Sequence, residues 1–373
     1  MAKRILHINC NYILSSLHQC LIERLDSVEL KNDVFVATYD KSRSIIRPHK
    51  NVNIVECFHK WDRVNFRYKQ AKICKSIEKN YNLREFDCIH AYTLFTDGNS
   101  AMRLSEKFDI PYVVAVRNTD VNDFFAKRFL LRDRGITIMR GAQAIFFLSE
   151  SYRKQVFEQY VPQKYREDLF RKTHIVPNGI DDFWLNNSPK DMHRNVTKEE
   201  EIHLIYAGRI DKNKNIPTIQ KAMKILKSMG INSRLTVVGR VEDPKEFQRI
   251  CADSRTTYIQ ALPKEELIDV YRRADIFVMP SYTESFGLVY AEAMSQGLPV
   301  VYSKGQGFDG QFEEGTVGFH ADARSPQSVA ESIRNVIEHY SEIQQRVIAC
   351  SHRFNWDAIS TIYCSIYDAL GNE

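Results

Sequence analysis

The feature that most constrains this chain is a repeated alternation of short apolar runs with stretches of helical spacing. Helical spacing is seen in Leu17, Cys20, Leu21 and Leu25, and again in Ile216, Ile219, Met223 and Leu226. The apolar runs cover residues 5–8, 34–37, 88–90, 112–116, 144–148 and 175–176, then 203–206, 235–238, 276–279 and 299–301. Strands that are apolar throughout and separated by helices predict parallel sheets covered on both faces.

The pattern stops once and then restarts. The polar segment 185–201 predicts a linker, and 373 residues at about 150 per domain favour two domains. We therefore expect an α/β protein of two doubly wound, Rossmann-like domains, residues 1–184 and 202–350, that face a central cleft. Residues 351–373 predict a last helix whose apolar stripe (Trp356, Ile359, Tyr363, Ile366 and Leu370) packs back towards the first domain.

Composition excludes several classes of protein. The 43% apolar and 27% charged fractions are those of a globular chain, and no window approaches 18 uncharged apolar residues. The apolar run after Arg4 is too short for a signal peptide, and the eight cysteines, which form no C-x-x-C pair, are expected to be reduced and mostly buried. These observations predict a cytoplasmic protein.

Charge is divided unevenly along the chain. Residues 1–190 hold 31 Lys and Arg against 22 Asp and Glu, whereas residues 191–373 hold 21 against 25. A basic first half fits anionic lipid headgroups or a phosphorylated acceptor, and an ordinary solvated surface is the alternative. Nucleic acid is not expected as a partner, because the chain has no zinc spacing, RNP motif or recognition-helix pattern.

Two loops that follow strands are suited to phosphate. After the strand at 276–279, Ser285 can cap a new helix, so that the amides of Phe286, Gly287 and Leu288 face a ligand. Glu284 lies before this helix and Glu292 within it, and two surface glutamates are the alternative interpretation. After the strand at 203–206, Gly208 is followed by Arg209 and then by Lys214, a pair of cations suited to a diphosphate.

Together these segments resemble the retaining glycosyltransferases of family 4, which have the two-domain GT-B fold. The resemblance is carried by Glu284 and Glu292 in "TESFGLVYAEAMSQGLPVV", by "AGRIDKNKN", by "VPNGID" and by "VVGR". It covers the second half of the chain and, more loosely, the first.

The resemblance implies a role for each of these residues. Arg209 and Lys214 would neutralise the departing diphosphate, Glu284 would bind the transferred sugar, and Glu292 the nucleotide ribose. Phosphate would contact the amides of residues 286–288, and the donor-binding set would further include Gly208, Ser285 and Asn178. No Asp-x-Asp occurs in the chain, so we expect no metal and no cofactor beyond the UDP- or GDP-sugar donor.

The first half departs from the family. Arg117 stands where the family has a histidine beside the donor sugar, and an arginine cannot act as a base at neutral pH. Asp120 keeps its family position, and both residues are expected at the catalytic centre. His90 could reach the cleft or be a satisfied structural histidine. Gly305-x-Gly307-x-x-Gly310 matches a dinucleotide fingerprint, but no apolar helix follows it, which favours a loop at the rim of the donor site.

These observations predict a hexosyltransferase that moves a sugar, with retention and without a metal, from a nucleotide sugar to a glycan or lipid-linked acceptor in surface polysaccharide biosynthesis. The stretch 124–132 mixes apolar and basic residues suited to the inner membrane surface, with an ordinary packed helix as the alternative. Two other functions remain open: a sugar-nucleotide epimerase or hydrolase of the same fold, and a non-catalytic relic that binds a nucleotide sugar.

Overall fold

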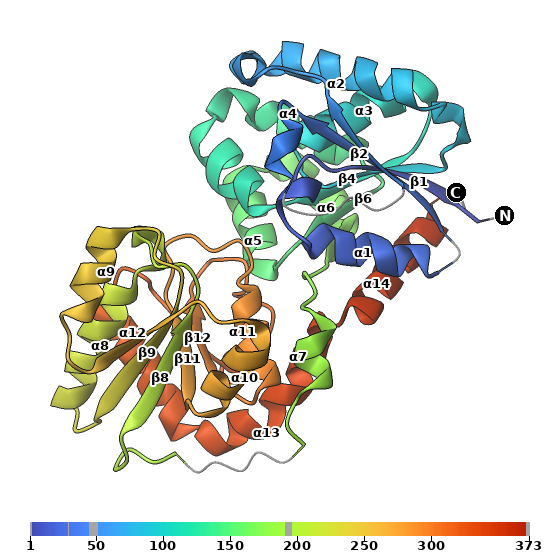
Figure 1. Ribbon diagram of the computed structural model, residues 1–373. Coiled ribbons are helices and arrows are strands. Elements are labelled where there is room, and N and C mark those ends of the chain that lie inside the picture. The colour runs from blue at the N-terminus through green and yellow to red at the C-terminus, as the bar shows by residue number, and fades with distance from the viewer. Residues whose placement is uncertain (1, 29, 45–50, 191–195, 371–373) are drawn as a thin grey trace. The chain divides into compact units, whose positions relative to one another are not determined.

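A computed structural model describes residues 2–28, 30–44, 51–190 and 196–370 (Figure 1). The chain forms two compact units. The first unit consists of Met1–Gly179 with Trp356–Glu373, and the second unit of Ile180–Asn355. The chain therefore leaves the first unit at Gly179 and returns to it at Trp356.

The first unit contains a seven-stranded parallel sheet of order β3-β2-β1-β4-β5-β6-β7. Its strands are β1 (Arg4–Ile8), β2 (Lys31–Thr38), β3 (Val52–Glu56), β4 (Cys88–Ala91), β5 (Tyr112–Val116), β6 (Ala144–Phe147) and β7 (Thr173–Ile175). Ile8 pairs with Phe35 of β2 and with Ala91 of β4, so the loops after these three strands leave the sheet at one edge. In open parallel sheets this carboxyl edge is where ligands bind.

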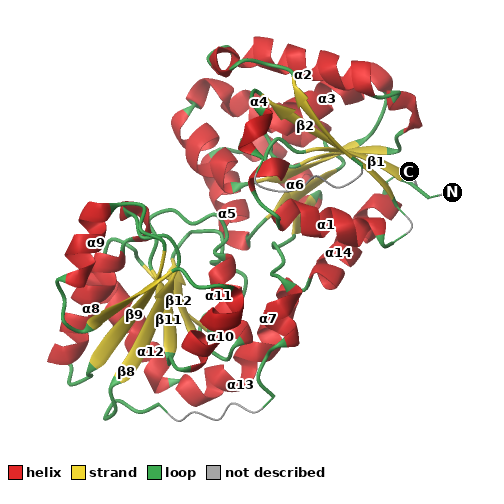
Figure 2. Cartoon of the chain, viewed as in Figure 1, coloured by secondary structure: helices red, strands yellow, loops and turns green. Residues whose placement is uncertain are grey.

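Helices cover both faces of this sheet (Figure 2). They are α1 (Leu17–Asp26), α2 (Phe66–Asn80), α3 (Thr96–Phe108), α4 (Arg132–Gly141), α5 (Glu150–Gln159), α6 (Gln163–Arg171) and α14 (Trp356–Ala369). Helices α1 and α14 pack together on one face, and the apolar side chains of α14 are part of the hydrophobic core of the first unit. The ring of Trp356 lies so close to Gly179 that a Cβ there would be 2.4 Å from it, which only glycine avoids.

The second unit repeats the design with a six-stranded parallel sheet of order β10-β9-β8-β11-β12-β13. Its strands are β8 (Ile202–Ala207), β9 (Ser233–Gly239), β10 (Thr256–Gln260), β11 (Ile276–Met279), β12 (Val300–Ser303) and β13 (Gly318–Ala321). Its helices are α7 (Asp182–Asn186), α8 (Ile216–Ser228), α9 (Pro244–Cys251), α10 (Lys264–Arg272), α11 (Leu288–Ser295), α12 (Pro326–Glu338) and α13 (Tyr340–Ser351). Strand β8 lies between β9 and β11, so the loops after these neighbours share one edge.

The two doubly wound α/β units and their parallel strands confirm the fold class expected from the sequence. Three strands, β3, β10 and β13, were missed, and all three are at the edge of a sheet. Edge strands are covered on fewer sides: β3 and β10 consist of half-buried and exposed residues, and the two middle residues of β13 are half-buried. The segment 185–201, expected as a linker, begins inside α7, and residues 191–195 of it lie outside the described part of the chain.

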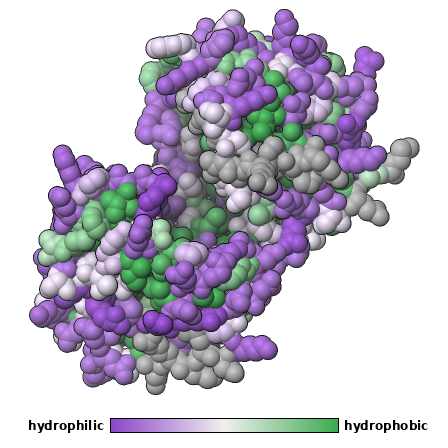
Figure 3. Space-filling view, in the orientation of Figure 1, coloured by the Kyte–Doolittle hydropathy of each residue, from purple (hydrophilic) through white to green (hydrophobic). Residues whose placement is uncertain are grey.

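Surface properties agree with a globular chain. The face of each unit seen in Figure 3 is mostly hydrophilic, with smaller hydrophobic areas. Among the described residues, none of the helices combines the length and the apolar character that crossing a bilayer requires. None of the eight cysteines forms a disulfide in the described part of the chain, but only Cys74 and Cys88 are fully buried, so the expectation that most are buried was wrong.

Candidate functional site

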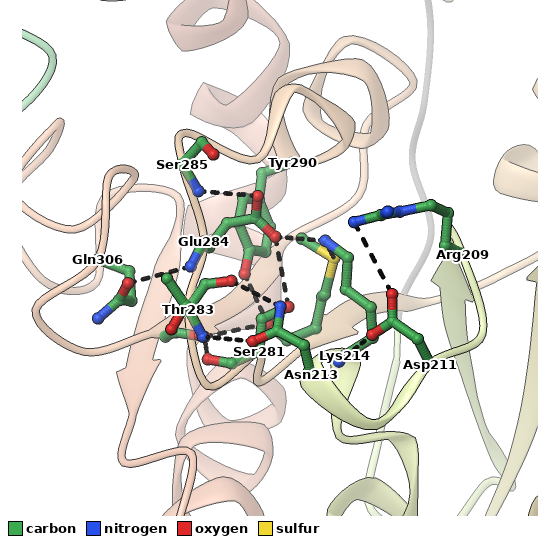
Figure 4. A network of polar contacts seen from close by, with 12 residues as sticks. Arg209, Asp211, Asn213, Lys214, Ser281, Thr283, Glu284, Ser285, Tyr290 and Gln306 are labelled. Carbon is green, nitrogen blue, oxygen red and sulfur yellow. Dashed lines mark hydrogen bonds and ion pairs between the residues drawn. The ribbon is translucent and has the colours of Figure 1, made fainter. Parts of the chain in front are cut away.

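In the second unit, the loops after β8 and β11 bring two oppositely charged residues into contact (Figure 4). Lys214 Nζ lies 2.6 Å from Glu284 Oε2, and the two side chains are only 12% and 11% exposed. The Ser281 hydroxyl donates to Glu284 Oε2 at 3.3 Å, and the Ser285 amide donates to Oε1 at 3.1 Å. The Glu284 carboxylate is thus fixed in direction by three partners, with Lys214 beside it.

Arg209 lies on the same loop as Lys214 but faces solvent. Its side chain is 61% exposed, and its guanidinium is 3.8 Å from the carboxylate of Asp211. Asp211 also accepts a hydrogen bond from the Lys214 amide at 3.0 Å, which caps the 3₁₀ turn Lys212–Lys214. The guanidinium is therefore anchored at one side while its remaining N–H groups are accessible to an anion.

Gly208 allows this loop to start at the end of the sheet. It has a φ of +151°, and its carbonyl oxygen would be 1.7 Å from a Cβ placed on Gly239 at the end of β9. Two glycines on neighbouring strands thus let the main chains meet where side chains would collide. The Tyr206 hydroxyl fixes the next carbonyl, that of Arg209, at 2.5 Å.

Asn213 joins the two loops, and sequence reasoning did not single it out. Its side-chain amide donates to the Thr283 carbonyl at 2.8 Å and accepts from the Thr283 amide at 3.1 Å (Figure 4). Its own carbonyl accepts from the Tyr282 amide at 2.9 Å. The only signal available was its place inside "AGRIDKNKN", between the two cations.

The helix after Glu284 begins later than the sequence predicts. Helix α11 begins at Leu288, and its N-cap is Gly287 with φ +77°, so the expectation that Ser285 caps the helix was wrong. Ser285 and Phe286 remain outside the helix because the Phe286 ring is buried against Phe308 and Phe354. The first-turn amides of α11, from Leu288 on, have no acceptor within the helix, and such amides are suited to phosphate.

Glu292 lies in α11, which separates it from Glu284 in the preceding loop. Burial and, to a smaller extent, the charge of Asp181 raise the pKa of Glu292 to about 7, against an opposing effect of Lys264. Asp181 is itself paired with Lys264 at 2.5 Å and caps α7 through the Phe183 amide. A half-buried carboxyl that ionises near neutral pH is suited to accept hydrogen bonds from sugar hydroxyls.

The glycine motif after β12 packs against the Glu284 loop. The Gly307 amide donates to the Glu284 carbonyl at 3.3 Å, and the Gln306 side chain accepts from the Glu284 amide at 3.0 Å. A Cβ on Gly307 would lie 1.9 Å from the Ser285 carbonyl oxygen. Turns follow Gly310 in place of the helix that a dinucleotide fingerprint requires. Gly307 is therefore needed for close packing of two loops.

Three of the expected site residues, Arg117, Asp120 and Asn178, lie in the first unit. Arg117 donates to the Asn178 side chain at 3.0 Å and to the Tyr92 carbonyl at 3.3 Å. Asp120 is buried and accepts from the amides of Leu94, Phe95 and Arg117 at 2.9–3.2 Å. Burial raises the pKa of Asp120 to about 6, although these amides favour the ionised form. Its carboxylate is thus engaged in holding the loops after β4 and β5.

His90 has a structural environment. It is fully buried, its Nδ1 is 2.6 Å from the Tyr367 hydroxyl, and its ring stacks on Tyr92. Burial lowers the pKa of His90 well below its usual value. Of the two interpretations left open by the sequence, the structural histidine fits these contacts, but only Nδ1 is hydrogen-bonded, and Nε2 is buried without a partner among the described residues.

A pocket of about 560 Å³ opens at the carboxyl ends of β1, β2, β4 and β5, and we call it the first-unit pocket. Three cations and two carboxylates line it, together with aromatic rings and threonine hydroxyls. These residues are Lys69, Lys127 and Arg128, then Asp120 and Asp123, then Tyr39, Phe58, Phe66 and Phe124, then Thr38, Thr93, Thr96 and Thr119. Sequence reasoning identified Asp120 and the stretch 124–132 but missed this pocket, because its walls come from segments far apart in the sequence.

One group of three possible metal ligands occurs among the described residues. Donor atoms of Asp309, Glu314 and His320 lie within 4.8 Å of one another. His320 Nδ1 is 3.3 Å from Asp309 and 3.0 Å from Glu314, and the hydrogen bond with Asp309 raises the pKa of the imidazole. The histidine and its two carboxylates already satisfy one another as an ion-paired cluster.

Part of the second unit matches the model of a known protein family. Residues 187–351 match the family model described as "Glycosyl transferases group 1". The chain is 26% identical over 305 residues to the D-inositol 3-phosphate glycosyltransferase of Paenarthrobacter aurescens (strain TC1), which covers 76% of this chain and 72% of that protein.

Solved structures share the fold of the whole chain. Sucrose-phosphate synthase from Thermosynechococcus elongatus aligns with a TM-score of 0.72 and 18% identity over 99% of both chains. Anabaena HepE in complex with UDP and glucose aligns with a TM-score of 0.66 and 17% identity, over 99% of this chain and 100% of that one. Taken together, most of the second unit matches the group 1 glycosyltransferase model, and the whole chain has the GT-B fold of these solved structures.

Proposed function

We propose that the chain is a retaining, metal-independent hexosyltransferase of family 4 that uses a UDP- or GDP-sugar. The observation that carries the proposal is the Lys214–Glu284 pair, with Arg209 on the same loop and the open N-terminus of α11 after the Glu284 loop. Fixed cations and first-turn amides stabilise the charge that develops on a departing diphosphate, as a metal ion does elsewhere.

In the proposed complex the second unit binds the donor. Glu284 holds the transferred sugar, Glu292 accepts hydrogen bonds from the ribose, and Arg209 and Lys214 contact the diphosphate. Gly208, Ser285 and the amides of residues 286–288 complete the donor-binding set. The bound UDP and glucose of Anabaena HepE support UDP as the first nucleotide to test.

The proposed reaction breaks the bond from the sugar C1 to the β-phosphate oxygen and forms a bond from C1 to an acceptor oxygen. The acceptor proton passes to the departing phosphate oxygen, so no strong enzymic base is needed. Arg117, whose side chain donates to Asn178 and to the Tyr92 carbonyl, then acts electrostatically. Asp120 accepts a hydrogen bond from the Arg117 amide and so positions the main chain of Arg117.

The first unit binds the acceptor in this proposal. Lys69, Lys127 and Arg128 line the first-unit pocket, which suits an acceptor that carries a phosphate or carboxylate. The relative from Paenarthrobacter aurescens is named for inositol 3-phosphate, which supports a phosphorylated acceptor. The proposal includes a glycan or lipid-linked acceptor, a role in surface polysaccharide biosynthesis, and a location in the cytoplasm at the inner membrane face.

Titration calorimetry with UDP and GDP, each with and without EDTA, tests the donor site. We expect one nucleotide to bind, with an affinity that EDTA does not change. At 100 times its Kd the bound nucleotide adds about 2.7 kcal/mol to the free energy of unfolding, which a thermal-shift panel of nucleotide sugars detects. Failure of both nucleotides to bind, or loss of binding with EDTA, contradicts the proposal.

A further inference from the structure

Four large apolar side chains are exposed together on the first unit, away from its core. Trp61, Val64 and Leu130 are 84%, 86% and 83% exposed, and Phe129 is also largely exposed. They come from two segments far apart in the sequence, the turn Lys60–Arg63 with the residues after it and the turn Phe129–Leu131. We call these four residues the apolar rim.

The two segments meet in space. Val64 and Leu130 line one hollow of about 770 Å³, and Trp61 and Val64 line a second of about 600 Å³. Exposed apolar residues scattered singly are ordinary, but a contiguous group that lines hollows marks an interaction surface.

The surroundings of the apolar rim are strongly basic. The described residues that line the two hollows include five cations and no carboxylate. These cations are Lys60, Arg67, Arg103, Arg128 and Arg134. Asp62, on the first segment, is 2.7 Å from Lys72, and Asp123, which precedes the second segment, is 2.5 Å from Lys127. The surface therefore combines exposed apolar groups with five cations.

We propose that the apolar rim and its five cations dock the protein on an anionic lipid bilayer. Apolar side chains that enter the headgroup region, flanked by Lys and Arg that pair with anionic lipids, are what interfacial binding requires. A second copy of this chain is disfavoured as the occupant, because a two-fold interface would place the same cations against one another.

The docking surface adjoins the first-unit pocket. Arg128 lines both that pocket and the hollow with Trp61, and Phe66 lines both that pocket and the hollow with Leu130. A lipid headgroup held at this surface is thus next to the threonines and cations of the pocket. Resting on the proposed function, this assigns the acceptor to the class of membrane-anchored molecules with an anionic headgroup.

Co-sedimentation of the full chain with vesicles tests the docking surface. We expect binding to phosphatidylcholine vesicles that contain phosphatidylglycerol, little binding to phosphatidylcholine alone, and weaker binding as salt increases. Trp61 also supplies a specific signal, since the other two tryptophans, Trp184 and Trp356, are buried. Its fluorescence should shift to the blue and be quenched by brominated lipid.

Variants test which residues are responsible for binding to anionic vesicles. The double variant Trp61→Ala/Leu130→Ala should weaken partitioning into anionic vesicles at least tenfold, because the apolar area that enters the bilayer is removed. Arg67→Gln/Arg103→Gln should reduce the preference for anionic vesicles. The matched control is Phe170→Ala, a half-exposed aromatic of α6 flanked by both acidic and basic residues, which should leave binding unchanged.

Several results would overturn the docking surface. They are equal binding to neutral vesicles, an unshifted Trp61 spectrum with bound vesicles, and full binding by the Trp61/Leu130 variant. A dimer in sedimentation velocity that this variant abolishes would instead assign the surface to a second copy. UDP and GDP titrations without vesicles report the donor site separately, so a failure there contradicts the proposed function and leaves the docking surface standing.

Discussion

Arg209 and Lys214 are the two cations of the proposed donor site. Neutralising them one at a time should change the free energy of unfolding by different amounts and weaken nucleotide binding to a similar extent. Lys214 is buried against Glu284 at 2.6 Å, whereas Arg209 is 61% exposed and only 3.8 Å from Asp211. Methionine removes the charge of either residue while keeping an extended apolar chain. The pair of variants therefore separates a role in stability from a role in binding.

The expected losses in folding stability and in nucleotide affinity follow from these environments. Removing one partner of a buried ion pair costs about 3–5 kcal/mol, and Glu284 keeps two other hydrogen bonds, so we expect about 3 kcal/mol for Lys214→Met. Arg209→Met should change the free energy of unfolding by no more than about 0.5 kcal/mol. A lost hydrogen bond to a charged phosphate is worth about 1.5–3 kcal/mol, so each variant should weaken nucleotide diphosphate binding roughly 10–100-fold.

Urea unfolding measures the first quantity and calorimetry with UDP and GDP the second. Lys212→Met is the matched control, since Lys212 is an exposed lysine of the same turn and should change neither quantity appreciably. If both cations can be removed without loss of nucleotide affinity, or if Lys212→Met weakens binding as much, the diphosphate does not bind between these loops.

Three further predictions concern single residues. The folded-state pKa of Glu292, about 7, lies above its ordinary 4.5, so the stability that its protonated form contributes is lost as pH rises through 7. Glu292→Gln should therefore flatten the pH dependence of urea unfolding between 4.5 and 7, and an unchanged slope would refute this. Gly307→Ala, whose Cβ would meet the Ser285 carbonyl, should lower nucleotide-sugar affinity at least tenfold, whereas Gly305→Ala, with open space around it, should strain only its own backbone. Asp120→Asn should cost about 1–3 kcal/mol in urea unfolding, because an amide cannot accept from three main-chain donors as a carboxylate does; a neutral effect would contradict the role described for it.

The central strands and the charged loops of the second unit were predictable because their residues are uniform or adjacent in sequence. Strands β8 and β11 are buried on every residue, and the segments that follow them hold Arg209, Lys214 and Glu284. Contacts that depend on packing were not predictable. Helix α11 begins at Leu288 and not directly after Ser285, because the Phe286 ring packs against Phe308 and Phe354, which lie later in the sequence.

In the first unit, even more of the structure depends on packing contacts that the sequence does not predict. Arg117 and Asp120 were identified by position in the chain, but the partners that define them, such as Asn178 and the Leu94 amide, come from other loops. The first-unit pocket and the apolar rim are assembled from segments far apart in the sequence. A pattern within one loop predicts a local turn, whereas four loops become a pocket only when the sheet brings them together.

The return of the chain to the first unit at Trp356 has a consequence for its synthesis. The core around β1, β2 and α1 includes side chains of α14, which the ribosome delivers only after all of Ile180–Asn355 has been made. At about 5–20 residues per second, the nascent first unit waits on the order of ten to thirty seconds for its last helix. During translation, the second unit can thus finish folding before the first unit does. Until α14 has been made, the sheet of the first unit is incompletely covered, and chaperones are expected to bind there.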